Sequence, residues 1–181
     1  MERNLTYIAL FAALTAVLGV IPPISLAAGI PPITLQSLGI MLCGTVLGAR
    51  RGALSVLLFL ALVAVGLPLL SGGRGGLGVF ASGSAGFLIG FPVAAFVSGW
   101  IMERSTLPVV WAAASAAVIG GIGVLYPFGI VGLSLMLGKT LAEAAPLAIA
   151  YLPGDLIKVV ICALVTQSLA RMRPAALLSR Q

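Results

Sequence analysis

The chain has 181 residues, of which 61% are hydrophobic and 8% are charged, and its mean hydropathy is +1.22. Soluble domains carry about one-quarter charged residues, so this composition indicates a membrane protein with little length left for a soluble catalytic or nucleotide-binding domain. The basic residues behind the net charge of +6 stand singly or in pairs, histidine is absent and the two cysteines lie far apart, which argues against nucleic-acid binding, metal sites, redox pairs and histidine-based catalysis.

Six apolar segments predict membrane-spanning helices that form a single domain over residues 1–181. In chain order they cover residues 5–21, 33–49, 52–67, 85–102, 107–135 and 154–170. A helix needs about 20 apolar residues to cross a bilayer, and the six segments are near that length. Prolines follow the first segment where a cleavable signal would carry small residues, so we expect it to remain as a permanent helix.

The stretch 107–151 decides the number of spans, because it is too long for one straight helix and contains several glycines and prolines. With six spans and a cytoplasmic amino terminus, most basic residues lie on the cytoplasmic side: Arg3, Arg50, Arg51, Arg104, Arg171, Arg173 and Arg180. This is the asymmetry that the positive-inside rule describes, and a seventh span would move the last three outside. We therefore predict one long, bent fifth helix, an external segment at 139–151 and both termini in the cytoplasm.

Small residues recur at a spacing of four, which lets helices approach closely in lipid. The pairs are Ala9 with Ala13, Ala12 with Ala16, Gly44 with Gly48, and Gly86 with Gly90. Such pairs serve packing within one chain or between chains, so the oligomeric state stays open. The aromatic residues Tyr7, Trp100, Trp111 and Tyr126 are expected at the membrane interfaces or in the packing of the bundle.

Polar residues gather on the predicted external side, at the ends of several helices. They are Thr34, Gln36, Arg74, Ser82, Ser84, Lys139, Glu143, Tyr151, Asp155 and Lys158. The glycine-rich connection 72–83 lies among them; glycine allows the backbone to approach a small molecule, and the alternative is a plain flexible loop.

Asp155 and Lys158 are the strongest candidates for a ligand site. Three residues apart on a helix, they share one face, and ionised groups at membrane depth are costly enough to indicate function. A carboxylate can accept the N–H groups of a cyclic urea while an ammonium donates to its carbonyl oxygen. The alternative is an internal salt bridge that helps Asp155 to cap the sixth helix.

Four runs of the sequence form a recognisable set: PITLQSLG at 32–39, GARRGALS at 48–55, the glycine-rich 72–90 and YLPGDLIK at 151–158. Together they resemble the BioY family, the biotin-capturing S components of energy-coupling-factor (ECF) transporters. The resemblance extends from the first helix to Ala170, and its most specific motif is the PGDxxK run before the last helix.

The resemblance implies an all-α, six-helix S component of the prokaryotic cytoplasmic membrane that binds biotin from outside with high affinity. Its partners would be membrane lipid, a transmembrane coupling subunit and ATP-hydrolysing subunits, and no cofactor is implied. The resemblance places Asp155 and Lys158 on biotin and places the other expected ligand residues around the pocket or in its cover: Thr34, Gln36, Arg74, Gly86, Phe87 and Tyr151. Phe87 stands where relatives usually carry tyrosine. Docking of the coupling subunit is implied for one of the two alanine pairs of the first helix.

Other functions stay open at this point. The binding fold would also suit another vitamin-like molecule, such as dethiobiotin or a thiamin precursor, or a solitary or oligomeric biotin transporter without ATPase partners. An intramembrane enzyme is disfavoured, because one carboxylate at membrane depth is too few for a protease pair or a metal centre. A structural subunit would require Asp155 and Lys158 to form a buried pair without a ligand.

Overall fold

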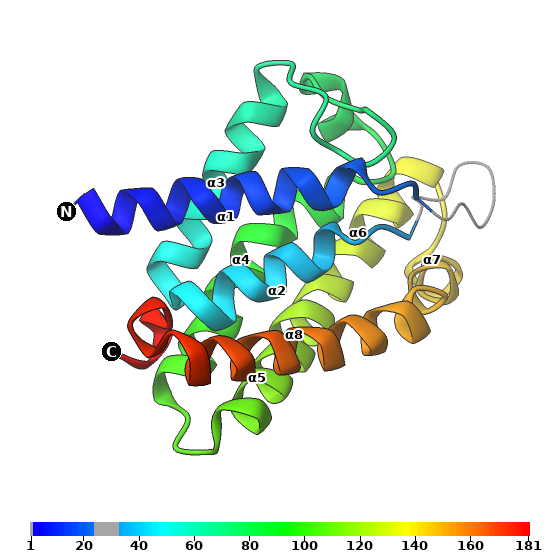
Figure 1. Cartoon of the computed structure of the whole chain (residues 1–181). Coiled ribbons are helices and arrows are strands. Elements are labelled where there is room, and N and C mark those ends of the chain that lie inside the picture. Colours follow the sequence, from blue (N-terminus) through cyan, green and yellow to red (C-terminus); the bar gives the residue numbers. More distant parts are fainter. Residues whose placement is uncertain (1, 24–32) are drawn as a thin grey trace.

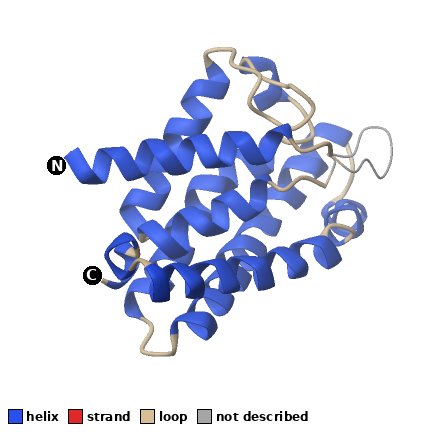
Figure 2. Cartoon of the chain, viewed as in Figure 1, coloured by secondary structure: helices blue, strands red, loops and turns tan. Residues whose placement is uncertain are grey.

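The computed structural model describes residues 2–23 and 33–181, and within them all the regular elements are helices (Figure 2). Pro31 and Pro32, which punctuate the first predicted connection, lie outside the described residues. The main helices are α1 (Glu2–Val20), α2 (Gln36–Leu47), α3 (Ala49–Ala64), α4 (Ala85–Arg104), α5 (Val109–Val118), α6 (Leu125–Leu137), α7 (Leu141–Ile149) and α8 (Leu152–Met172). Short turns of 3₁₀ helix cover Leu77–Ala81, Pro174–Ala176 and Leu178–Arg180.

The long fifth helix of the prediction is confirmed. A π-helical segment, η2 (Ile119–Val124), joins α5 and α6 into one rod over Val109–Leu137. A π segment has a wider turn than an α-helix, so the residues on either side of it face different directions than an unbroken helix would give. The segment that the sequence placed between this rod and the last helix contains the short helix α7.

The predicted six-helix bundle is confirmed: α1, α2, α3, α4, the α5–α6 rod and α8 pack side by side, and α7 is a short addition. Three of them are long and apolar enough to cross a membrane: Ala85–Arg104, Val109–Leu137 and Leu152–Met172. Both chain ends lie on one side of the bundle and α7 lies on the other (Figure 1). This arrangement fits an even number of spans.

The second helix is the centre of the bundle, and it is shorter than predicted. Every residue of α2 except Ser37 is buried, and α2 packs against α1, α3, α4, α5 and α8. Its 12 residues rise about 18 Å, against a hydrocarbon thickness of about 30 Å. It begins at Gln36 rather than at residue 33.

The glycine pairs pack helices together within the chain. Gly44 of α2 lies against the backbone of α4, and Gly86 of α4 lies against Gly132 of α6, so that an added β-carbon at either position would collide with backbone atoms. These contacts fix α4 between α2 and α6. The sequence showed the small residues, but it did not show which helices they join.

Candidate ligand-binding site

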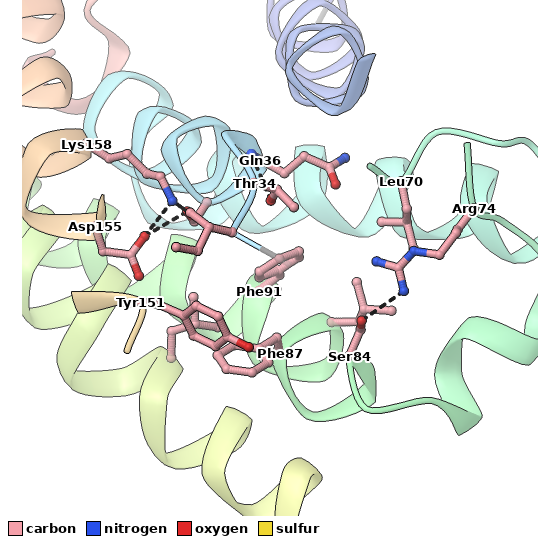
Figure 3. Close-up of a pocket in the computed structure, with 14 residues that line it drawn as sticks. Thr34, Gln36, Leu70, Arg74, Ser84, Phe87, Phe91, Tyr151, Asp155 and Lys158 are labelled. Atoms are coloured by element: carbon pink, nitrogen blue, oxygen red, sulfur yellow. Dashed lines mark hydrogen bonds and ion pairs between the residues drawn. The ribbon is translucent and has the colours of Figure 1, made fainter. Parts of the chain in front are cut away.

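A cavity opens at the end of the bundle where α2 begins (Figure 3). It contains about 610 Å³ of space between protein atoms, including its open mouth. Its wall combines side chains from α2, α4, α6, α8 and the connections between them: Ile33, Thr34, Gln36, Ser37, Leu70, Arg74, Ser84, Phe87, Leu88, Phe91, Leu125, Tyr151, Asp155 and Lys158.

Asp155 and Lys158 form a buried ion pair in this wall. Pro153 lies at the start of α8, where its missing N–H removes no helical hydrogen bond, and Asp155 follows in the first turn, close to the positive end of the helix dipole. The Nζ of Lys158 is 2.7 Å from Oδ1 of Asp155, and the two residues are 4% and 5% exposed. The two residues share one face of α8, as their spacing predicts, and the internal salt bridge that was the alternative to a ligand contact is present in the structure.

Two hydroxyl groups complete a network around this pair. Ser37 donates to Oδ1 of Asp155 at 3.1 Å and accepts from Nζ of Lys158 at 2.9 Å. The hydroxyl of Tyr126 donates to Oδ2 of Asp155 at 2.8 Å. Sequence reasoning missed both residues. Ser37 stands next to Gln36 at the start of α2, but Tyr126 lies in an apolar span and gives no signal, because its approach to Asp155 depends on how the α5–α6 rod packs against α8.

Gln36 lines the cavity, and the structure gives its amide a second role. Its Oε1 accepts from the backbone N–H of Ser71 at 3.0 Å, and its Nε2 donates to the carbonyl of Leu69 at 2.9 Å and to that of Thr15 at 3.4 Å. Both amide N–H groups are thus bonded to backbone. The side chain of Gln36 ties α2 to α1 and to the connection that carries Arg74.

The glycine-rich connection has a defined turn that presents Arg74. Leu70 and Arg74 exchange two backbone hydrogen bonds, 2.9 and 3.2 Å long, around Gly72 and Gly73, whose φ angles of 79° and 70° favour glycine. The guanidinium of Arg74 donates to the carbonyl of Ser71 at 3.2 Å and to the hydroxyl of Ser84 at 3.1 Å. In Figure 3 Arg74 and Ser84 lie at one end of the cavity, and Asp155 and Lys158 lie at the other.

Aromatic side chains form the wall between these two polar ends. The rings of Phe87 and Tyr151 meet edge to face, with centroids 5.8 Å apart and an angle of 77° between their planes. This is a favourable geometry for aromatic pairs. Figure 3 shows Phe91 beside them. A phenylalanine at position 87 therefore leaves the wall apolar at this point.

Seven of the eight residues expected to bind ligand line the cavity. They are Thr34, Gln36, Arg74, Phe87, Tyr151, Asp155 and Lys158. Gly86 does not line it, because it lies at the close approach of α4 to α6. Sequence reasoning missed the apolar lining residues Leu70, Leu88, Phe91 and Leu125. In the described part of the chain, no group of three or more metal-binding side chains gathers.

The arrangement suits a small molecule with a polar head that both donates and accepts hydrogen bonds, an apolar middle and an anionic tail. A bundle of apolar helices with such a cavity at one end defines a membrane-embedded binding protein for a small organic ligand.

Comparison with known proteins identifies the family. The model of the BioY family matches residues 2–175, and the chain belongs to this family. It is 53% identical to "Biotin transporter BioY" of Rhodobacter capsulatus, with 99% of this chain and 100% of the relative covered. It is 52% identical to the protein of the same name from Rhizobium etli, with 90% of each covered.

A solved structure agrees with the fold. The chain resembles the crystal structure of the S-component for biotin from an ECF-type ABC transporter, with a TM-score of 0.90 and 29% identity, over 97% of this chain and 96% of that one. The family is one of transporter components, which answers the intramembrane-enzyme alternative.

Proposed function

We propose that this chain binds biotin from the external side of the membrane and acts as the S component of an ECF transporter that takes biotin up. The single observation that carries the proposal is the buried Asp155–Lys158 pair in the wall of the cavity. An ion pair at membrane depth is costly, and binding of a ligand that forms hydrogen bonds with both partners is a function that accounts for its presence. The names of the relatives and the likeness to a biotin S-component support the choice of biotin.

The two polar ends of the cavity suggest how biotin lies in it. Its ureido group would meet Asp155 and Lys158, which offer a carboxylate and an ammonium to the N–H and C=O groups of a cyclic urea. Its bicyclic ring would pack on Phe87, Phe91 and Tyr151. Its carboxylate would lie near Arg74, whose guanidinium has N–H groups beyond the two that Ser71 and Ser84 accept.

The exposure of the two alanine pairs in the first helix, α1, favours one pair as the docking site for the coupling subunit. Ala12 is 3% exposed and faces the core, and Ala16 is half-buried. Ala9 and Ala13 are exposed on the outer face of α1, where a second helix can approach them closely. We therefore place docking on Ala9 and Ala13.

The chain is an integral membrane protein, and the basic residues support its orientation. Arg50 and Arg51 lie in the first turn of α3, and Arg104 is the last residue of α4. These helix ends lie on the side of the bundle that also carries both chain ends (Figure 1). The positive-inside rule assigns that side to the cytoplasm of a prokaryotic cell. The cavity then opens to the exterior, and the single domain of residues 1–181 delivers biotin inward when the coupling subunit and its ATP-hydrolysing partners engage α1.

Titration calorimetry on purified protein tests the ligand and the pair together. We expect the parent to bind biotin, and Asp155→Asn and Lys158→Met to weaken binding by about 10-fold or more, because each removes a charged hydrogen-bonding group. Lys139→Met, which removes an exposed cation outside the cavity wall, is the matched control and keeps parental affinity. Parental affinity in both pair variants would refute the proposed contacts, and a parent that does not bind biotin would refute the ligand.

A further inference from the structure

The hydrogen bonds that Asp155 and Lys158 already make leave few donor and acceptor positions for a ligand. Among the described residues, Oδ1 accepts from Lys158 and Ser37, and Oδ2 accepts from Tyr126. A carboxylate has about four acceptor positions, so about one remains, on Oδ2. Lys158 donates to Asp155 and Ser37, and about one of its three N–H groups remains. The pair therefore offers one acceptor and one donor.

Tyr126 contacts the carboxylate of Asp155 from outside the cavity wall. It is 7% exposed and its side chain is absent from the cavity wall, so it reaches the site only through Asp155. It follows the π segment Ile119–Val124 at the start of α6, and the neighbouring Leu125 lines the cavity. The start of α6 therefore gives one residue to the wall and the next to the support of Asp155.

We infer that Tyr126 is a positioning residue that fixes the carboxylate of Asp155, so that the site selects ligands with an N–H donor beside a carbonyl. This inference rests on the proposed function, because it assigns the ureido group of biotin to Asp155 and Lys158. With Ser37 and Lys158 on one oxygen and Tyr126 on the other, the carboxylate plane is held at both ends before the ligand arrives. A ligand N–H then meets an acceptor that needs no reorientation, which strengthens binding by preorganisation.

The consequence is a preference for an N–H over an isosteric atom that cannot donate. A ligand with an oxygen in place of that N–H leaves the Oδ2 position unpaired and is rejected. Without the Tyr126 hydroxyl, the carboxylate of Asp155 turns more freely and Oδ2 loses its fixed direction. The preference for the N–H ligand then falls, while contacts elsewhere in the cavity stay as they were.

The test compares biotin with its two cyclic carbamate analogues, in which an oxygen replaces one or the other ureido N–H. Binding is measured for the parent, for Tyr126→Phe and for Tyr7→Phe, which removes a hydroxyl from α1 outside the cavity wall. We expect the parent and Tyr7→Phe to prefer biotin over one carbamate by about 10-fold or more. Tyr126→Phe is expected to weaken biotin about 10-fold and that carbamate less than about 2-fold.

The ratio of the two affinities separates positioning from folding. A variant that only lowers the binding-competent fraction weakens both ligands by the same factor, so an unchanged ratio in Tyr126→Phe overturns the inference. If Tyr126→Phe gives no folded protein, Ser37→Ala removes the other hydroxyl donor to Asp155 and is expected to lower the same ratio; an unchanged ratio there overturns the inference too. A parent that does not bind biotin would instead overturn the proposed function.

Discussion

Replacing Arg74 by methionine tests the end of the cavity opposite to Asp155. Methionine keeps an apolar stem and removes the guanidinium. Arginine has five N–H groups, and two of them donate to Ser71 and Ser84, which leaves about three for a carboxylate. A hydrogen bond to a charged group contributes about 1.5–3 kcal/mol. Because Arg74 is only half-buried, we take the lower end and expect biotin to bind about 10- to 30-fold more weakly.

The informative comparison is with biotinol, in which an alcohol replaces the carboxylate. Arg74→Met also removes the hydrogen bonds from the guanidinium to Ser71 and Ser84, and that loss affects both ligands alike. Calorimetric titration of biotin and biotinol against parent and variant should show biotin weakened about 10-fold more than biotinol. Equal weakening of the two ligands would mean that Arg74 only shapes the turn, and unchanged biotin affinity would mean that the carboxylate is held elsewhere.

Three further changes test the coupling surface, the packing and the external helix. Ala13→Leu on the exposed face of α1 is expected to keep biotin binding and to lower biotin uptake by cells with the coupling subunits by about 10-fold, because a close helix contact is blocked. Val160→Leu on α8 is the control. Normal uptake in Ala13→Leu would exclude this face of α1 as the docking surface. Gly86→Val puts a β-carbon 2.8 Å from the Cα of Gly132 and is expected to cost about 1–3 kcal/mol of stability, read as a fall in Tm, whereas an unchanged Tm would contradict the packing. Hydrogen bonds from the backbone and hydroxyl of Thr140 lower the pKa of Glu143 below its ordinary value. A carboxyl group with a lowered pKa in the folded state stabilises the fold at pH values above its pKa in the unfolded chain, and this stabilisation is lost as the pH falls through the folded-state pKa. Amide protection in α7 should therefore decrease below about pH 4 in the parent and lose this pH dependence in Glu143→Gln.

The sequence predicted the positions of two long helices closely, because apolar length is a local property of the chain. The long rod Val109–Leu137 and the last helix, α8, appear where the pattern placed them, within two residues at each end. The second span was too long by several residues, because α2 is surrounded by protein rather than lipid. A helix buried on all sides does not need to match the thickness of the bilayer, and hydropathy alone does not show this.

Spacing along the sequence predicted one part of the candidate site, and the resemblance to the family implied the cavity residues that come from other segments. Asp155 and Lys158 lie one turn apart on one helix, so spacing alone brought them together. Tyr126 could not be placed, because its hydroxyl reaches Asp155 only through the packing of the α5–α6 rod against α8. For the same reason the sequence did not show that Gln36 binds backbone of two other segments, or that Gly86 faces α6 instead of the cavity.

A structure of the protein determined with bound biotin tests the central claim most directly. The account predicts a ureido nitrogen within about 2.7–3.2 Å of the carboxylate of Asp155, with the ureido oxygen facing the ammonium of Lys158 and Tyr126 still bonded to Asp155. Biotin bound elsewhere, with Asp155 and Lys158 bonded only to each other and to Ser37 and Tyr126, would contradict it.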